Sequence, residues 1–154
     1  MTRADPDRDV VVERWIAAPP ETVFSYFEDP ARWLQWQGVG AVIQPRPGGV
    51  FRMNVRGDGF ASGRFVEVRP PHRIVFTWGW EASDDVPPGS STVEIDLHGE
   101  AEGTRVRLRH RGLPSVDSVS QHRSGWEHYL ERLVVAASGG DPGRDPIRVD
   151  GEQR

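Results

Sequence analysis

The chain of 154 residues contains no cysteine and no lysine, so all 19 of its basic residues are arginine. The absence of cysteine excludes a disulfide scaffold, a thiolate zinc site and a cysteine nucleophile. No apolar run approaches the roughly 18 residues that a membrane span needs, and the first residues lack the apolar segment of a signal peptide. We therefore expect a cytoplasmic protein that does not span a membrane.

An excess of positive charge is missing as well, since the formal net charge is -4 at pH 7. This balance predicts that nucleic acid is not a partner. The sequence contains no His-x-His or His-Glu-x-x-His pattern and no Gly-x-Ser-x-Gly turn, which are typical of metal sites and of serine hydrolases. Accordingly, we expect no metal and no cofactor, and we assign no catalytic residue.

The sequence is rich in large aromatic side chains, with 6 Trp and 6 Phe. Its length suits one domain. Residues 1–8 are polar and charged, while residues 139–154 are rich in Gly, Pro and charge and have Ile147 and Val149 as apolar anchors. We predict a single domain over residues 9–138, with both ends flexible or draped on its surface.

The spacing of apolar residues predicts one strand, two short helices and then a run of strands. Asp9–Ile16 is rich in β-branched residues, which is typical of a strand. Pro20 suits the first turn of a helix, and Asp29 with Pro30 provides the N-cap and first position of a second short helix. From residue 39 to residue 111 apolar residues alternate, and turn signals divide this region into about six strands with one apolar and one charged face.

The last predicted element is a long helix. Ser118 and Gln121 are expected to form a capping box and Gly139 to end the helix, which leaves about 19 residues between them. Its apolar stripe consists of Val119, His122, Trp126, Tyr129, Leu130, Leu133, Val134 and Ala137. Gly125 costs about 1 kcal/mol in a helix interior, so it predicts close backbone packing or a local bend. The predicted fold is α+β: a curved antiparallel sheet of about seven strands around this helix.

Several short motifs occur in the order of one known family. They are Ala18-Pro19-Pro20-Glu21-Thr22-Val23-Phe24, Asp29-Pro30 with Leu34-x-Trp36, Arg73-Ile74-Val75-Phe76-Thr77-Trp78, and His122-x-x-Gly125-Trp126. The order of elements resembles the START-like (SRPBCC) superfamily with its helix-grip fold. The motifs are similar to those of the activator of heat-shock protein 90 ATPase homologues, the AHSA-type family. The resemblance implies a bacterial stand-alone domain with a hydrophobic cavity between sheet and helix, a lipid or polyketide as ligand, and a role in stress response.

A set of mostly aromatic residues is predicted to line such a cavity. The set consists of Trp33, Trp36, Phe51, Met53, Phe60, Phe76, Trp78, Trp80, His110, His122, Trp126 and Tyr129. Aromatic side chains on inward faces serve either as core or as pocket lining. His110 falls on the inward face of the last predicted strand and His122 on the apolar stripe of the helix. Both therefore need hydrogen-bond partners or a ligand.

The charged face of the sheet is predicted to be a solvated network of ion pairs. Arg105, Arg107, Arg109 and Arg111 point outward from the last strand, and Glu94, Asp96 and Glu67 are their expected neighbours. Glu67 follows Phe65 in the alternation, so the side on which its carboxylate lies stays open.

Three hypotheses about function remain. The first is a non-catalytic protein that binds a small hydrophobic molecule in the cavity. The second is an enzyme of the cyclase or lyase type that uses His110, His122 and Glu67 as acid and base. The third is a stress-related interaction module that contacts a chaperone, as the family resemblance implies. A homodimer is a further hypothesis.

Overall fold

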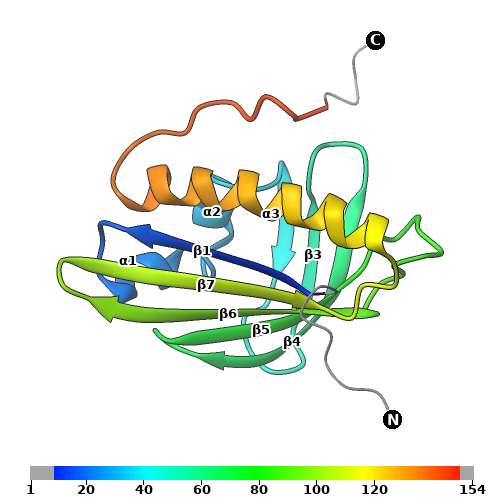
Figure 1. Cartoon of the computed structure of the whole chain (residues 1–154), viewed down its shortest axis with the longest axis horizontal. Coiled ribbons are helices and arrows are strands. Elements are labelled where there is room, and N and C mark those ends of the chain that lie inside the picture. The colour runs from blue at the N-terminus through cyan, green and yellow to red at the C-terminus, as the bar shows by residue number, and fades with distance from the viewer. Residues whose placement is uncertain (1–8, 150–154) are drawn as a thin grey trace.

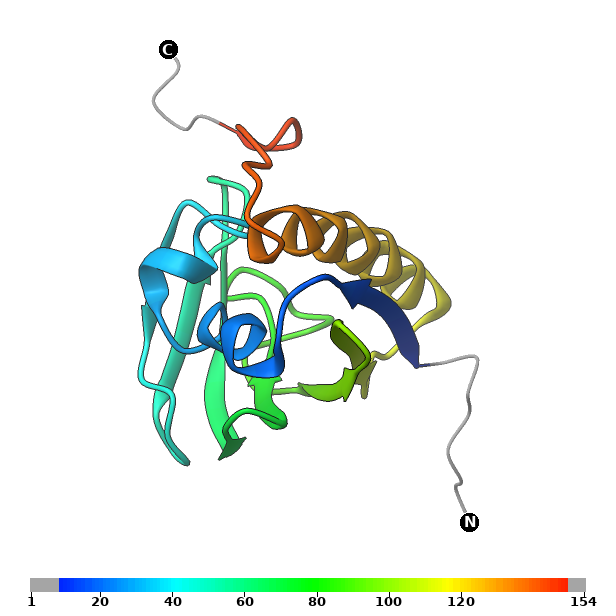
Figure 2. The same ribbon diagram turned by 90° about the vertical axis from the view of Figure 1, so that its left-hand side faces the viewer.

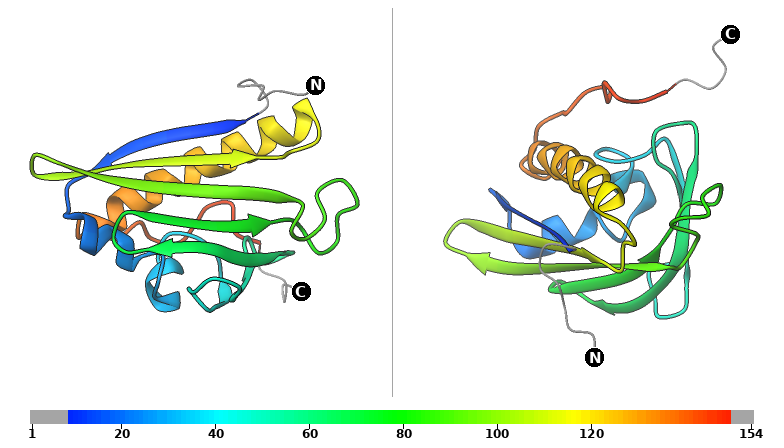
Figure 3. Two further views of the ribbon diagram at one scale, coloured as in Figure 1. Left: turned by 90° about the horizontal axis from the view of Figure 1, so that it is seen from below. Right: turned by 45° about the vertical axis from the view of Figure 1, so that its right-hand side comes forward.

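Seven antiparallel strands form one curved sheet in the order β1-β7-β6-β5-β4-β3-β2. The structure is a computed structural model that describes residues 9–149. The strands are β1 (Val10–Ile16), β2 (Gly40–Ile43), β3 (Val50–Asn54), β4 (Phe60–Arg69), β5 (Arg73–Trp78), β6 (Ser91–Glu100) and β7 (Gly103–Arg111). The sheet curves around α3 (Val116–Ala137), which lies across its concave side (Figures 1 and 3).

Two short helices, α1 (Pro20–Ser25) and α2 (Pro30–Trp33), follow β1 as predicted. Each begins with proline, whose missing N–H costs nothing in the first turn of a helix. Asp29 caps α2, because its carboxylate accepts a hydrogen bond of 2.9 Å from the backbone N–H of Ala31. Figure 2 shows both helices across the open end of the curved sheet, which they help to close.

The long helix begins earlier than the sequence analysis predicted. Its N-cap is Ser115, whose hydroxyl accepts from the N–H of Ser118, while the Ser118 hydroxyl accepts from the N–H of Ser115. The predicted capping box of Ser118 and Gln121 is therefore wrong. Ser118 occupies the N3 position, where this motif usually has glutamate or glutamine. No helix within residues 9–149 is long and apolar enough to cross a bilayer.

The two faces of the sheet separate as predicted. On β6, Val93, Ile95 and Leu97 are buried between outward-facing acidic neighbours. The arginines of β7 pair with acids on the outer face: Arg105 with Glu100, Arg107 with Glu13, Arg109 with Asp9, and Arg111 with Glu94. Asp96 and Glu67 instead pair with Arg73 of β5. The charged face is thus an ion-pair network on solvated side chains.

Residues 139–149 turn back and run over α3 (Figure 1). Arg132 donates to the carbonyl oxygens of Pro142 and Gly143, and the His128 ring lies 2.7 Å from the Asp145 carboxylate. The N–H of Val149 donates to the carbonyl of Arg56. The tail is therefore draped on the domain through polar contacts, and its flexibility stays a prediction. Residues 1–8 and 150–154, predicted to be flexible, lie outside the described residues.

Candidate functional site

Five of the predicted lining residues form a closed core, which we call the sealed cluster: Trp33, Trp36, Phe51, Met53 and Phe76. All five are completely buried. The rings of Trp33 and Trp36 stack with centroids 5.7 Å apart, and those of Phe51 and Phe76 stack at 4.5 Å. Among the residues described, none of the five lines either pocket discussed below.

The indole N–H groups of the sealed cluster are both satisfied. Trp33 Nε1 donates to the side chain of Gln37 at 2.8 Å, and Trp36 Nε1 donates to the carbonyl of Tyr26 at 3.2 Å. A buried polar group without a partner costs about 1–3 kcal/mol, so these two contacts allow the rings to be enclosed entirely. The sealed cluster has the properties of core rather than of a binding surface.

Five other predicted residues line a pocket of about 820 Å³, which we call the tryptophan pocket: Trp78, Trp80, His122, Trp126 and Tyr129. It lies between the first half of α3 and the loops that follow β3 and β5. Polar side chains such as Gln37, Arg56 and Asp58 also contribute to its lining, and Ile147 brings the tail into its wall. Its size and its mixture of aromatic wall and few polar groups are typical of small-molecule sites.

Phe60 is not brought to this pocket. In β4 the neighbouring Ala61 is completely buried, which places Phe60 on the opposite face. There the guanidinium of Arg52 lies 3.8 Å from the Phe60 ring centroid and also binds Glu81. Contrary to the prediction, the structure does not place Phe60 in the lining of the pocket. The sequence analysis placed Phe60 inward, whereas Ala61 takes the first inward position of β4.

His110 lies in the interior beside the tryptophan pocket, completely buried. Trp126 Nε1 donates to His110 Nδ1 at 2.9 Å. Because an indole N–H can only donate, Nδ1 is the accepting nitrogen and the proton is on Nε2. His110 Nε2 then donates to the Ser91 hydroxyl at 2.8 Å, and that hydroxyl donates to the carbonyl of Trp78. Every polar atom of the imidazole ring is thus paired inside the protein.

His122 is arranged in the opposite tautomer. Its Nδ1 lies 2.7 Å from the carbonyl of Ser118, which can only accept, so Nδ1 carries the proton. Its Nε2 accepts the indole N–H of Trp80 at 3.0 Å. The two imidazole rings are 5.0 Å apart between centroids and nearly perpendicular.

Burial favours the neutral form of both rings. Desolvation holds the pKa of His110 well below its usual range, and the nearby His122 lowers it further. Burial also lowers the pKa of His122, against the hydrogen bond to Ser118, which raises it. In this arrangement neither ring has a free nitrogen for a substrate proton. General acid–base work would first require a hydrogen bond to break.

Glu67, the third residue of the enzyme hypothesis, is on the other side of the sheet. The register of β4 and β5 shifts between Phe65 and Glu67, and this irregularity turns Phe65 inward while Glu67 faces out. Its carboxylate binds Arg73 at 3.1 Å and Arg69 at 2.5 Å, and the hydrogen bond from Arg73 lowers its pKa. A strict alternation could not locate this shift.

In the part of the chain that the structure describes, two buried side-chain polar atoms lack a hydrogen-bond partner: Trp78 Nε1 and Tyr129 Oη. Both side chains line the tryptophan pocket. Burial raises the pKa of Tyr129 to about 12, so its phenol is a neutral donor at physiological pH. In the sealed cluster the equivalent groups are paired. Unmet hydrogen-bonding capacity is therefore concentrated at the pocket.

The sequence analysis missed Gly125 and Ile147 as pocket residues. Ile147 gave a signal as one of two apolar residues in a polar tail, and Gly125 gave one as a glycine inside a helix. Neither signal shows which surface the residue faces, because that depends on where the tail and the loops after β3 and β5 pack.

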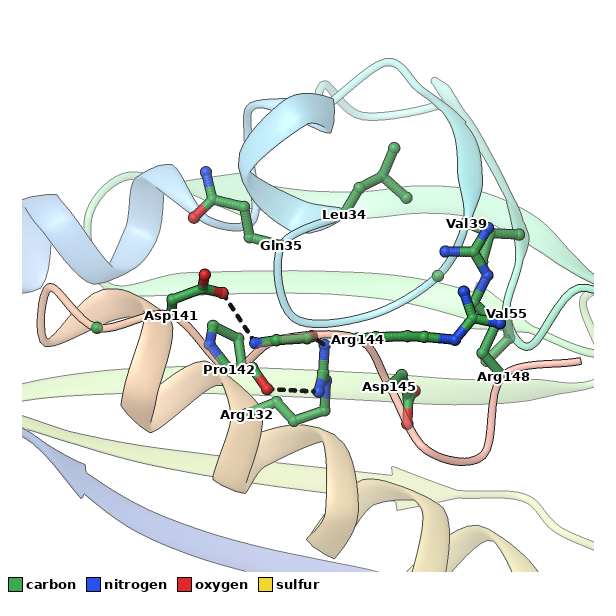
Figure 4. A pocket seen from close by; sticks show the side chains of 13 residues that line it. Leu34, Gln35, Val39, Val55, Arg132, Asp141, Pro142, Arg144, Asp145 and Arg148 are labelled. Carbon is green, nitrogen blue, oxygen red and sulfur yellow. Dashed lines mark hydrogen bonds between the residues drawn. The ribbon is translucent and has the colours of Figure 1, made fainter.

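A second pocket of about 460 Å³ lies between the turn after α2 and the tail. Figure 4 shows Arg132, Arg144 and Asp145 around it, with Arg132 bonded to Pro142. Arg132 also donates to the carbonyl of Trp36, so it ties α2 and the tail to α3. The charged lining and these internal contacts fit a junction between segments better than a site for an apolar ligand.

A curved antiparallel sheet around one long helix, with two short helices after the first strand, defines a START-like protein of the helix-grip fold. The profile of the family "Activator of Hsp90 ATPase homolog 1-like protein" matches residues 17–138. The chain belongs to this family, as the motifs predicted.

Three similar proteins illustrate the range of relatives. The AHSA1-like protein of Rhizobium etli is 48% identical, with 92% of this chain and 89% of that chain covered and a TM-score of 0.70. DynU16, described as a putative protein in the dynemicin biosynthetic locus, is 28% identical, with 94% and 51% covered and a TM-score of 0.77. The human "Activator of 90 kDa heat shock protein ATPase homolog 1" is 25% identical over 125 residues, which cover 80% of this chain and 35% of the human protein. The chain thus spans about a third of that curated relative.

Proposed function

We propose that this protein binds a small, mostly apolar molecule in the tryptophan pocket without transforming it. The observation that carries the proposal is an aromatic-lined pocket in which His122 is fully paired, with His110 fully paired in the interior beside it. His122 binds Ser118 and Trp80, and His110 binds Ser91 and Trp126. His122 is a neutral part of the pocket wall, His110 is a neutral part of the interior behind it, and the pocket supplies apolar area for burial of a ligand.

The aromatic lining of the tryptophan pocket and one relative support a particular class of ligand. Trp78, Trp80 and Trp126 offer large flat surfaces that bind ring systems by stacking. The likeness to DynU16, whose description places it in a biosynthetic locus, supports a product of small-molecule biosynthesis, such as a polyketide, over a membrane lipid.

The test is a titration with N-phenyl-1-naphthylamine, a neutral fluorescent aromatic probe, together with native mass spectrometry of freshly purified protein. We expect one probe molecule per chain and a negative heat-capacity change, because binding buries apolar surface. Trp80→Ala should weaken binding. Trp15→Ala is the matched control, since Trp15 is 43% exposed and lies outside the pocket lining. Equal affinity in the two variants would contradict the proposal.

The enzyme hypothesis makes a different prediction for the histidines. In a binder, His110→Gln or His122→Gln retains a hydrogen-bonding side chain, so affinity should fall by no more than about 1–3 kcal/mol. In an enzyme the same variants would keep binding and lose turnover. Turnover of a candidate substrate that is lost in both variants, with binding retained, would replace our proposal.

The co-chaperone hypothesis rests on the likeness to the human activator of the 90 kDa heat shock protein ATPase. It is tested by adding the protein to heat-shock protein 90 and measuring the ATPase rate. Stimulation that is unaffected by Trp80→Ala would support an interaction surface separate from the tryptophan pocket.

A further inference from the structure

Gly125 occupies the interior of α3 although no close contact among residues 9–149 requires a glycine there. It is not among the glycines with positive φ, so its backbone is accessible to any residue. A Cβ atom built at this position meets no heavy atom within 4 Å beyond its chain neighbours and the adjoining backbone of its own helix. Glycine is the poorest helix former after proline. The position therefore lowers helix stability without a local compensation.

Other glycines of the chain show what a structural requirement looks like. A Cβ at Gly63 would collide with the carbonyl of Thr77, and a Cβ at Gly79 would collide with the carbonyl of Pro87. At those positions two backbone segments pass too closely for a side chain. The sequence analysis expected close packing or a bend at Gly125, and the open space around it shows that the packing explanation is wrong.

The space next to Gly125 is the tryptophan pocket. Gly125 lines it, with His122 one turn before and Tyr129 one turn after on the same helix face. Seven residues of helix separate those two rings, which corresponds to roughly 10 Å along the axis. Between them the helix is bare backbone at Gly125, while Ser124, Trp126 and His128 also contribute to the lining, as do Trp78 and Trp80.

We propose that Gly125 keeps open a slot in which a flat ring of the ligand lies against the backbone of α3. This inference rests on the proposed function and specifies its ligand: a planar, mostly apolar ring system rather than a flexible chain. Glycine is the residue that permits close approach of a ligand to the backbone, and a ring fits between the side chains of His122 and Tyr129. The side chains of Trp78 and Tyr129, whose Nε1 and Oη lack a partner among the described residues, line the same pocket.

The experiment compares Gly125→Leu and Gly125→Ala with the control Glu127→Leu. Glu127 is exposed on the same helix and does not line the pocket. The probes are N-phenyl-1-naphthylamine, which carries a planar naphthalene ring system and is called the flat probe below, and lauric acid, which is a flexible chain. We expect Gly125→Leu to weaken the flat probe about tenfold or more, because the added side chain overfills the slot. Glu127→Leu should leave affinity unchanged.

Thermal melting provides a readout that needs no ligand. Gly125→Ala should melt at the same temperature as the unmodified protein or higher, since alanine favours the helix and meets open space. A lower melting temperature would show that the glycine is structural and would overturn the inference. Should Gly125→Leu fail to fold, Gly125→Ala carries the test, with about a threefold loss expected for the flat probe.

The outcomes separate the two proposals. If neither probe binds the unmodified protein, the proposed function fails. If the flat probe binds but Gly125→Leu retains its affinity, the function stands and the slot is contradicted. If Gly125→Leu weakens the binding of lauric acid as much as it weakens the binding of the flat probe, the preference for a planar ring is contradicted.

Discussion

The sealed cluster and the tryptophan pocket are built from the same kinds of residue and differ in how their polar atoms are satisfied. In the sealed cluster each indole N–H binds a side chain or carbonyl supplied by the segment around α1 and α2. In the pocket two indoles donate to imidazole rings, and the indole of Trp78 has no partner. Trp33 and Trp36 are completely buried and line neither pocket. Trp78 and Trp126 are nearly as buried, yet they line the tryptophan pocket together with the partly exposed Trp80.

The same comparison separates the two ends of α3. Its second half packs Leu130, Leu133 and Ala136 into the core. Its first half carries His122, Gly125 and Trp126 along the pocket. One helix thus packs into the core with its C-terminal half and lines the tryptophan pocket with its N-terminal half.

The largest expected difference between the two regions is in stability. Trp33→Ala should lower the free energy of unfolding by about 3–5 kcal/mol, because it removes a completely buried aromatic side chain. Trp80→Ala, at the half-buried wall of the pocket, should cost about 1 kcal/mol. Urea unfolding measures both. Equal losses would break the distinction between core and wall.

The hydrogen-bond chain beside the pocket should give the next largest effect. Ser91→Ala removes the acceptor of His110 Nε2–H and the donor to the carbonyl of Trp78. We expect a loss of about 1–3 kcal/mol in the free energy of unfolding, the cost of buried groups left unpaired. Ser120→Ala, at an exposed position of α3, is the matched control and should change little. An unchanged free energy of unfolding in Ser91→Ala would show that the hydrogen bonds through Ser91 do not hold His110 in place.

The two histidines should make stability depend on pH. Their pKa values are lowered in the folded protein, so below the unfolded value of about 6.5 the unfolded chain binds more protons. The stability is fully present above about pH 6.5 and is lost as the pH falls toward the folded pKa values. Glu67 and Glu81, whose pKa values are lowered, add their own loss only below about pH 4.5. Between about pH 7.5 and about pH 5, the free energy of unfolding from urea melts should change less with pH in His122→Gln than in the unmodified protein. The same pH dependence in both proteins would contradict this account.

The smallest expected effect on stability is that of the tail. Removal of residues 141–154 should change the melting temperature by no more than about 2 °C, because the tail is held by a few polar contacts and buries little. Binding of the flat probe should weaken by about two- to threefold, since Ile147 belongs to the pocket wall. A large drop in melting temperature would place the tail with the core rather than with the pocket.

The fold could be predicted from particular residues. Alternation along β6 and β7 assigns their faces, and Asp29 with Pro30 marks α2, because strands and helix caps are specified by neighbours in sequence. The site could be predicted only in part. Trp33 and Trp78 both point inward. They differ because the indole N–H of Trp33 has a hydrogen-bond partner and that of Trp78 has none among the described residues. That partner lies elsewhere in the chain, as do the contacts that place Gly125 and Ile147 at the pocket.

The most direct test of the account uses the indole N–H signals of the 6 tryptophans in a nitrogen-15 NMR spectrum. The signals are assigned by single Trp→Phe variants, and N-phenyl-1-naphthylamine is then added. We predict that the signals of Trp78, Trp80 and Trp126 shift with saturation at one probe per chain, while those of Trp33 and Trp36 stay in place. Shifts at Trp33 and Trp36 equal to those at Trp78 and Trp80, or no shift at any of them, would contradict the division into a sealed cluster and a ligand pocket.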